Sequence, residues 1–395
     1  MTPRVVRGTF SRLVGMLRAR SPRGDWIFLS GAAPDEGNIL ELVRHLLDEY
    51  DGRLYWARGP APHHLEALGI RSDRVVVLES HASLSALYRY ARAEVVFTTH
   101  GAYGMPTPDD RKPVIDLWHG EASKGGGLLY PDRTDASRTS SALLASARAL
   151  APVKAGLALM PLERTVHAPP PRVDQFRRPT SDDQLHAVGI DPDRPFVVWM
   201  PTFRQAGPAV VNTTDVEGDR SMATTFSRDV VSVLDAAGIG VVVKPHPADS
   251  VSRQVEDAVI VTSEDLYRAS IPLYSLLGRS AGLVTDYSSV WIDYLHRGAP
   301  IGFYLPDLAS FVEGRGDFSP GLLDHLPGPV LDSRETVDRF ARDVLAPDDV
   351  VGPQQASARE FIDLVDDVTP SAAALVEALR TAGLFPASRL QGAGA

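Results

Sequence analysis

The sequence predicts two α/β domains in series, each built on a doubly wound parallel sheet. Short apolar runs rich in valine and isoleucine alternate with segments of helical spacing, as is typical of parallel strands that helices cover on both faces. This alternation occurs in two series separated by a proline-rich stretch. A chain of 395 residues also exceeds the roughly 250–300 residues that one hydrophobic core usually serves.

The first series predicts an N-terminal domain over residues 25–170. Between its first two strands, Ile39, Val43 and Leu46 keep helical spacing, and Asn38 is expected to cap that helix. The expected strands are Trp26–Ser30, Leu54–Ala57, Val75–Leu78, Val95–Thr98 and Val114–Leu117.

The second series predicts a C-terminal domain over residues 184–350. Its expected strands are Phe196–Met200, Gly240–Lys244, Val259–Thr262, Gly282–Thr285 and Ile301–Leu305, with helices near 226–237, 289–297 and 335–346. The proline-rich, polar stretch Ala168–Asp183 is expected to be the linker. C-terminal helices at 356–366 and 371–382, within 351–385, precede a tail over 386–395. Two such domains are expected to bind a ligand in the cleft between them, at the carboxyl ends of the strands.

Composition excludes several classes of protein. The chain has no cysteine, which excludes disulfides, thiolate metal sites and a cysteine nucleophile and fits a reducing compartment. The net charge of −10 argues against a general nucleic-acid binder. The sequence has no apolar run long enough to span a membrane and no recognisable secretory signal. We therefore expect a cytoplasmic protein.

The segment 1–24 is a basic exception to this acidic average. It carries six arginines and no acidic residue, and its apolar residues recur on one helical face: Val6, Phe10, Leu13, Val14 and Leu17. Such a helix can lie in the headgroup region of an anionic membrane, which would place the protein on the inner face of the cell membrane. The alternative is a first helix packed on the domain, or a frayed terminus.

His119 is the first candidate for chemistry. It follows the predicted strand Val114–Leu117, and the glycines at 125–127 allow a ligand to approach the backbone closely. An imidazole with a pKa near neutrality is a suitable base for an alcohol. The alternative is a structural histidine, hydrogen-bonded at a domain edge.

Two further candidates follow strands of the second series. Arg204 ends the segment Trp199–Arg204, where a guanidinium can bind a phosphate through paired donors or pair with an acid on the surface. His246 lies between two prolines, which stiffen its loop and fix where the imidazole points. The alternative is that the prolines only make a turn.

The segment from Thr285 to Asp293 suggests an anion site. Ser288 and Ser289 lie where a strand ends and a helix begins, so hydroxyls and unpaired N–H groups can together bind a diphosphate, although serine is also a common helix cap. The sequence contains no glycine-rich dinucleotide motif, Walker loop or GxSxG elbow. His63 and His64 lack partners at ligand spacing, so no metal site is predicted.

Taken together, these segments resemble the CDP-glycerol glycerophosphotransferase family of teichoic-acid primases and polymerases, over about residues 25–345. The matching positions are Trp118, His119, Gly120 and Lys124; Pro171, Arg172 and Asp174; Pro201–Arg204; His246 and Pro247; Thr285–Ser289 with Asp293; and Arg315, Gly316 and Pro327–Pro329. The sequence departs from the family pattern at Glu121, Ala122 and Ser123, where a Thr-Pro-Leu-like run is usual, and a carboxylate next to the expected base can change the choice of acceptor or donor. An N-terminal extension typical of long polymerases is also missing, so we expect little more than the catalytic portion.

The resemblance implies a GT-B fold and transfer of an alditol phosphate, glycerol phosphate foremost, from a CDP-alditol to a lipid-linked or polymer acceptor, with release of CMP. It also implies that His119 and His246 are essential. We assign His119 as the general base. The expected substrate-binding residues are Arg204, Ser288, Ser289, Lys124, Asp286, Asp293, Glu313 and Arg315. The alternative is a purely structural role, as a cap or in a salt bridge, for Asp286, Asp293, Glu313 and Arg315.

No cofactor is expected, and Mg²⁺ would enter only on the phosphates of the substrate. Three other functions remain open at this point. A GT-B hexosyltransferase would transfer a sugar, and a UDP-sugar 2-epimerase would use two similar domains but should carry a glycine-rich turn in place of Tyr287–Ser289. A non-catalytic membrane scaffold would bind nucleotide without releasing CMP.

Overall fold

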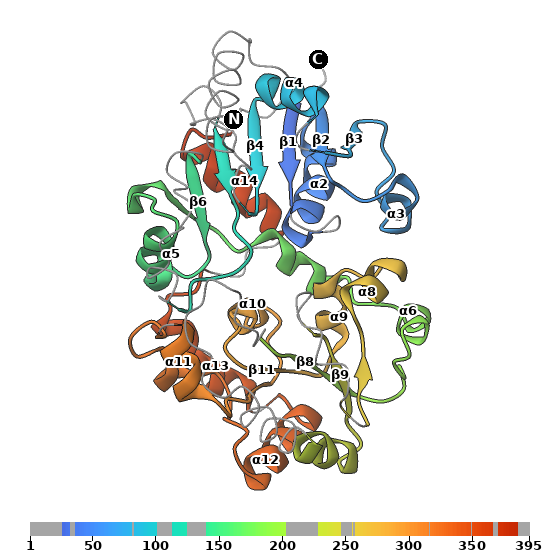
Figure 1. Ribbon diagram of the computed structural model, residues 1–395, viewed down its shortest axis with the longest axis vertical. Helices are drawn as coiled ribbons and strands as arrows, with labels where there is room; N and C mark the ends of the chain where they lie inside the picture. Colours follow the sequence, from blue (N-terminus) through green and yellow to red (C-terminus); the bar gives the residue numbers. More distant parts are fainter. Residues whose placement is uncertain are drawn as a thin grey trace, which may run out of the picture. The chain divides into compact units, whose positions relative to one another are not determined.

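The chain forms two compact units in the computed structural model (Figure 1). The first unit comprises Met1–Glu121, Pro131–Asp174 and Val365–Ala395, and the second comprises Ala122–Tyr130 and Gln175–Leu364. The structure describes residues 26–31, 36–80, 83–100, 113–124, 140–202, 228–245, 255, 257–315, 317–348, 350–365 and 370–385. The basic segment 1–24 and the tail 386–395 lie outside the described residues.

The first unit holds a seven-stranded sheet in the order β3-β2-β1-β4-β5-β6-β7, with every neighbouring pair parallel. Its strands are β1 Trp26–Ser30, β2 Arg53–Ala57, β3 Val75–Leu78, β4 Val95–Thr98, β5 Val114–Asp116, β6 Ala142–Ala145 and β7 Thr165–His167. The five strands expected from the sequence are confirmed. The sequence did not predict β6 and β7, because the alanine and leucine residues of β6 favour helix by intrinsic propensity and β7 is only three residues long.

Helices cover both faces of this sheet, as the continuous apolar strands predicted. Ile27 and Leu29 pack in one core with α2 and α14, while Phe28 between them packs in another with Tyr55 and with Tyr90 of α4. The period of two along a strand sends alternate side chains to opposite faces. The α-helices of this unit are α2 Gly37–Glu49, α3 Pro62–Ala67, α4 Leu84–Arg92, α5 Ala151–Leu157 and α14 Ser371–Thr381.

The second unit holds a five-stranded parallel sheet in the order β10-β9-β8-β11-β12. Its strands are β8 Phe196–Met200, β9 Gly240–Val243, β10 Val259–Ile260, β11 Gly282–Thr285 and β12 Ile301–Phe303. All five expected strands are present, three of them one or two residues shorter at the carboxyl end. Residues 228–236 are helical, and the further helices are α6 Asp182–Ala187, α8 Ser263–Arg268, α9 Leu273–Arg279, α10 Val290–Tyr294, α11 Leu308–Arg315, α12 Arg334–Leu345 and α13 Val351–Phe361.

The stretch Ala168–Asp183, expected as a polar linker, is a packed element. It contains the 3₁₀ helix η5 (Pro171–Arg177), and the division between the two units falls inside it. In the second unit, Phe176 is buried against α9, where a Cβ atom on Gly278 would lie 2.7 Å from the Phe176 carbonyl oxygen. The prolines therefore mark a short helix in close contact with its neighbours. Its polar residues Arg172, Asp174 and Gln175 are buried, whereas the polar residues at 177, 178 and 181–183 are exposed.

The sequence predicted that the two C-terminal helices form a segment of their own. In the structure each helix belongs to one of the two units instead. Helix α13 begins at Val351, earlier than expected, and belongs to the second unit, whereas α14 belongs to the first. In Figure 1 the red helix α14 lies against the blue and cyan strands of the first sheet. The apolar face of α14, including Leu375 and Leu379, completes the core on that side of the sheet.

Candidate active site

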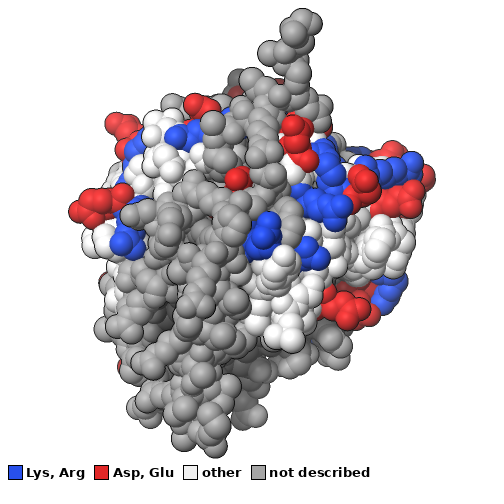
Figure 2. Space-filling view, turned by 90° about the horizontal axis from the view of Figure 1, so that it is seen from above, with Lys and Arg blue, Asp and Glu red and all other residues white. Residues whose placement is uncertain are grey.

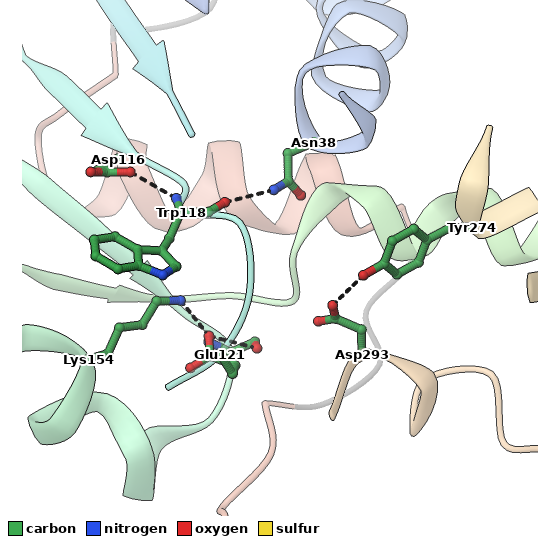
Figure 3. A network of polar contacts seen from close by, with 8 residues as sticks. Asn38, Asp116, Trp118, Glu121, Lys154, Tyr274 and Asp293 are labelled. Carbon is green, nitrogen blue, oxygen red and sulfur yellow. Dashed lines mark hydrogen bonds and ion pairs between the residues drawn. The ribbon is translucent and has the colours of Figure 1, made fainter. Parts of the chain in front are cut away.

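A left-handed turn follows β5 and carries His119. Trp118 has a backbone φ of 54°, a region that is costly for a residue with a bulky side chain. Its N–H donates to Oδ1 of Asp116 at 2.9 Å, and its carbonyl oxygen accepts from Nδ2 of Asn38 at 3.2 Å (Figure 3). Both polar groups of Trp118 are therefore held by side chains, and the turn places His119 just beyond the carboxyl end of the strand.

Asp116 is almost completely buried at the end of β5. Burial raises the pKa of its carboxyl group to about 6, although the N–H of Trp118 and the charge of Lys154 act in the opposite direction. A charged carboxylate costs free energy at this buried position. The presence of an aspartate is explained by its hydrogen bond from the backbone N–H of Trp118.

His119 has a neutral imidazole at physiological pH. Desolvation lowers its pKa to about 4, with further lowering by His100, Arg172 and Lys154, and a hydrogen bond to the backbone of Thr99 acts against them. The residue as a whole is nevertheless exposed to solvent. A neutral ring that donates one N–H to a backbone carbonyl keeps a lone pair on the other nitrogen, which can accept a proton.

His100 is a neighbour that the sequence analysis missed. Its ring stacks on His119 with centroids 4.5 Å apart, and its Nδ1 atom lies 3.0 Å from Oγ1 of Thr99. His100 follows β4, which pairs with β5, so the two strand ends bring the two histidines together. The signal was present in the sequence, since a histidine directly after a buried strand was the reason for choosing His119.

Arg172 supplies a buried positive charge near both histidines. It lies on η5 with 5% of its surface exposed, and its charge lowers the pKa of His100 and of His119. Arg172 is one of the positions that match the family motifs, but no role was predicted for it from the sequence. A guanidinium at this position can stabilise an anionic substrate next to the imidazole.

Asn38 does not cap α2, contrary to the sequence expectation. The cap is Glu36, whose side chain accepts the N–H of Ile39 at 3.0 Å. Asn38 is fully buried instead, and its Oδ1 accepts the N–H of Arg172 at 3.2 Å. Asn38 does not act as a cap because both ends of its side-chain amide bond to backbone groups far away in the sequence.

Glu121 and Lys154 form a buried cluster two residues beyond His119. Oε1 of Glu121 lies 2.7 Å from Nζ of Lys154 and accepts from the backbone N and Oγ of Ser146 at 2.9 and 3.0 Å. The cluster ties the end of the His119 loop to α5 and β6 (Figure 3). Glu121 is thus held by partners inside the first unit. From the sequence, this carboxylate had instead been expected to affect the choice of substrate.

In the second unit, Ser288 and Ser289 lie between the end of β11 and the start of α10. Ser289 is the N-cap residue of α10 without a side-chain capping bond, and Oγ of Ser288 accepts the N–H of Val290 at 3.4 Å. Both serines are partly exposed. Asp286 is buried, and its carboxylate accepts the backbone N–H of Thr202 at 2.8 and 3.0 Å. Asp286 therefore ties the end of β11 to the residue that follows β8.

Asp293 lies inside the second unit, with 1% of its surface exposed. The hydroxyl of Tyr274 donates to its Oδ2 atom at 2.5 Å (Figure 3). This contact joins α10 to α9, so the carboxylate has a structural partner within the unit.

Lys124 and Glu313 lie in the same unit on less buried positions. Nζ of Lys124 is 5.1 Å from the ring centroid of Phe311, a cation–π contact, and Lys124 pairs through its backbone with Phe318. Glu313 is exposed on α11, whose last residue is Arg315. The side chain of Arg315 lies outside the described part of the structure.

The remaining two candidates, Arg204 and His246, lie outside the described residues. The residue just before the His246 loop is described: Lys244 is buried at the end of β9, and its Nζ donates to the carbonyl of Pro245 at 2.9 Å.

Within the described ranges, no group of three or more histidine or acidic residues is placed to hold a metal ion. No described helix is long and apolar enough to cross a membrane.

Comparison with solved structures identifies the class of fold. The wall teichoic acid polymerase TagF is similar over 96% of this chain and 94% of its own, with a TM-score of 0.63 and 16% identity. A TagF variant soaked with CDPG has a TM-score of 0.65 at 16% identity, covering 95% of this chain and 92% of its own. A putative UDP-N-acetylglucosamine 2-epimerase from Listeria monocytogenes has a TM-score of 0.54 at 12% identity, over 91% and 96%. These likenesses and the two parallel sheets define a GT-B fold.

Sequence comparison then identifies the family. The profile of CDP-Glycerol:Poly(glycerophosphate) glycerophosphotransferases matches residues 36–360, and the chain belongs to this family. A teichoic acid ribitol-phosphate primase from Bacillus spizizenii is 31% identical over 135 residues, which are 34% of this chain and 31% of that protein. The matched region thus spans about a third of the curated relative.

Proposed function

We propose that this chain transfers an alditol phosphate, expected to be glycerol phosphate, from a CDP-alditol to a hydroxyl group of a lipid-linked or polymer acceptor in teichoic-acid synthesis. The acceptor oxygen loses its proton and bonds to the phosphorus that bears the alditol, while the bond between the two phosphates breaks and CMP leaves. The observation that carries the proposal is the position of His119, which lies just beyond β5 with its ring stacked on His100 at 4.5 Å, where its neutral imidazole can take the proton.

The surroundings of His119 suit an anionic substrate. Its pKa of about 4 reflects burial together with the nearby charges of Arg172 and Lys154. A bound diphosphate would bring negative charge to this region, which raises the pKa of the imidazole towards neutrality and makes it a stronger base. Arg172 would at the same time stabilise charge on the phosphate oxygens.

The second unit would bind the donor. Ser288 and Ser289 are partly exposed at the start of α10, where their hydroxyls can donate to phosphate oxygens. We assign Arg204 and His246 to the leaving phosphate, Lys124 to the acceptor phosphate, and Glu313 and Arg315 to the nucleotide. Asp286 and Asp293 would act by fixing the elements that carry these groups, since their carboxylates contact Thr202 and Tyr274.

A panel of donors tests the proposal. The full chain is incubated with CDP-glycerol, CDP-ribitol or UDP-sugars and a lipid acceptor analogue, and the released nucleotide and the product mass are measured. We expect CMP and a product heavier by one alditol phosphate. Release of UDP with a glycosylated product, epimerisation of a UDP-sugar, or binding without any release of nucleotide would each overturn the proposal.

We also propose that the protein works on the inner face of the cell membrane, where a lipid-linked acceptor lies. Helix α4 exposes Leu84 and Tyr88, one turn apart, to 84% and 52%. Arg89 and Arg92 follow on the same helix, and Arg92 contacts the ring of Tyr88. Figure 2 looks onto the end of the molecule where α4 lies in Figure 1, and basic side chains lie on this face among acidic ones. Apolar and cationic side chains together favour contact with anionic lipid.

Sedimentation with vesicles of phosphatidylglycerol and phosphatidylcholine tests this location. The double variant Leu84→Ser/Tyr88→Ser should bind less than the wild type at low salt, and deletion of residues 1–24 should weaken binding further. Equal binding by the wild type and both variants would contradict a membrane role for these segments.

A further inference from the structure

The turn before His119 depends on its surroundings for its shape. Trp118 has a φ of 54°, and a residue with a large side chain persists in this region only where other groups hold it there. The structure shows which groups do so. Oδ1 of Asp116 accepts the N–H of Trp118 at 2.9 Å, and Nδ2 of Asn38 donates to its carbonyl at 3.2 Å.

Asn38 joins two parts of the candidate site. Its side chain is fully buried, so water does not compete for its amide. While Nδ2 holds the carbonyl of Trp118, Oδ1 accepts the N–H of Arg172 at 3.2 Å. One side chain thus connects the loop of the proposed base with the segment that carries the buried Arg172.

The contact with Trp118 acts directly on the next residue. The carbonyl of Trp118 and the N–H of His119 belong to one planar peptide. Fixing the carbonyl therefore fixes the plane from which the His119 side chain departs. A rotation of this peptide would move the imidazole away from the ring of His100, which stacks on it at 4.5 Å, and from the backbone of Thr99.

We infer that Asn38 is a positioning residue, which holds the Trp118–His119 peptide so that the imidazole is presented to the acceptor hydroxyl. The inference rests on the proposed function, in which His119 is the base. The amide of asparagine carries its donor and its acceptor on two separate atoms of one short, uncharged side chain, so it can hold two backbone groups at once. Aspartate at this position keeps the acceptor for Arg172 and loses the donor for Trp118, and alanine loses both.

Steady-state kinetics of Asn38→Asp and Asn38→Ala test the inference. We expect kcat to fall by about 10- to 100-fold through misplacement of the base, with the KM for CDP-glycerol little changed. The matched control is Gln355→Ala. Gln355 is a buried amide in the second unit whose Nε2 donates to the carbonyl of Ala299 at 2.9 Å. This control should lower the melting temperature and leave kcat unchanged.

The His119 imidazole provides a readout that does not depend on turnover. In protein with ¹⁵N-labelled histidine, both Asn38 variants should shift the His119 ring signals and raise its pKa from about 4 towards 6.5 as the ring loses its packed environment. Wild-type kcat in both variants, a wild-type His119 titration, or an equal kcat loss in Gln355→Ala would overturn the inference. Full activity of His119→Ala would instead overturn the proposed function. The titration of His119 in the two Asn38 variants would still test whether Asn38 positions the ring.

Discussion

Lys154 and Glu121 form a buried ion pair, with Nζ of the lysine 2.7 Å from Oε1 of the glutamate and only 2% and 3% of the two side chains exposed. Ser146 donates two hydrogen bonds to the same oxygen. Two desolvated charges are stable in this environment only as a pair with further hydrogen bonds. The pair therefore fixes the position of Glu121, and with it the end of the loop that begins at His119.

Removing one partner of this pair should destabilise the protein strongly. We expect Lys154→Met to lower the free energy of unfolding by about 3–5 kcal/mol, because it leaves a buried carboxylate without its counterion. The double variant Glu121→Gln/Lys154→Met should lose less, since the remaining amide oxygen still accepts from Ser146. Urea unfolding of both single variants and the double variant measures the coupling. Additive losses would contradict the pairing.

The pKa of Asp116 predicts a pH-dependent stability. The folded-state pKa of about 6 lies above the ordinary 3.8, so the folded protein binds this proton more tightly than the unfolded chain does. The wild type should therefore lose stability as the pH rises from about 4 to 6. Asp116→Asn keeps an acceptor for Trp118 and cannot ionise. It should be more stable than the wild type at pH 8 by up to ~3 kcal/mol.

Urea unfolding at pH 4 and at pH 8 checks this prediction. At pH 4 the carboxyl is already protonated in the folded state, so the two proteins should differ little there. A variant that is less stable than the wild type at pH 8 would show that the charged carboxylate is needed to hold the turn.

The pH dependence of catalysis should reflect the low pKa of His119. The acid limb of kcat/KM reports on the free enzyme, and activity is lost as the base becomes protonated. In Asp116→Asn, where the neighbouring carboxyl cannot titrate, we expect this limb near pH 4. A limb at about 6.5, the ordinary value for histidine, would contradict the environment described for the ring.

Asp174 should be important for docking the last helix. Its carboxylate accepts the backbone N–H groups of Ser371 and Ala372 at 2.7 and 3.1 Å, at the start of α14. Asp174→Ala should lower the free energy of unfolding by about 1–2 kcal/mol, the usual effect of losing an N-terminal cap. Thermal or urea unfolding measures it, and Asp182→Ala, at an exposed aspartate of α6, is the control. Equal stability of both variants would contradict the capping role.

The sequence predicted most of the fold because its signals are local. Runs such as Val95–Thr98 are apolar and β-branched, and they are buried strands in both sheets. The strand Ala142–Ala145 lacks such residues, and only its neighbours in the sheet make it extended. Asn38 looked like a cap because its place before an apolar helical face resembles one, but tertiary partners determine its role.

The candidate site was predicted only in part, for a similar reason. His119 could be found because it directly follows a strand, and His100 carried the same signal. The contributions of Arg172, Lys154 and Asn38 come from contacts between residues distant in sequence, which no spacing rule reveals. Trp118 gave no sign of its left-handed backbone, since that conformation depends on Asp116 and Asn38 together.

The role of His119 as the base is the central claim, and single-turnover release of CMP from CDP-glycerol with saturating acceptor tests it most directly. His119→Ala should slow this step by about 10²–10⁴-fold while binding of CDP-glycerol stays unchanged. The control His63→Ala, at an exposed position of α3, should react at the wild-type rate. A wild-type rate in His119→Ala would contradict the mechanism.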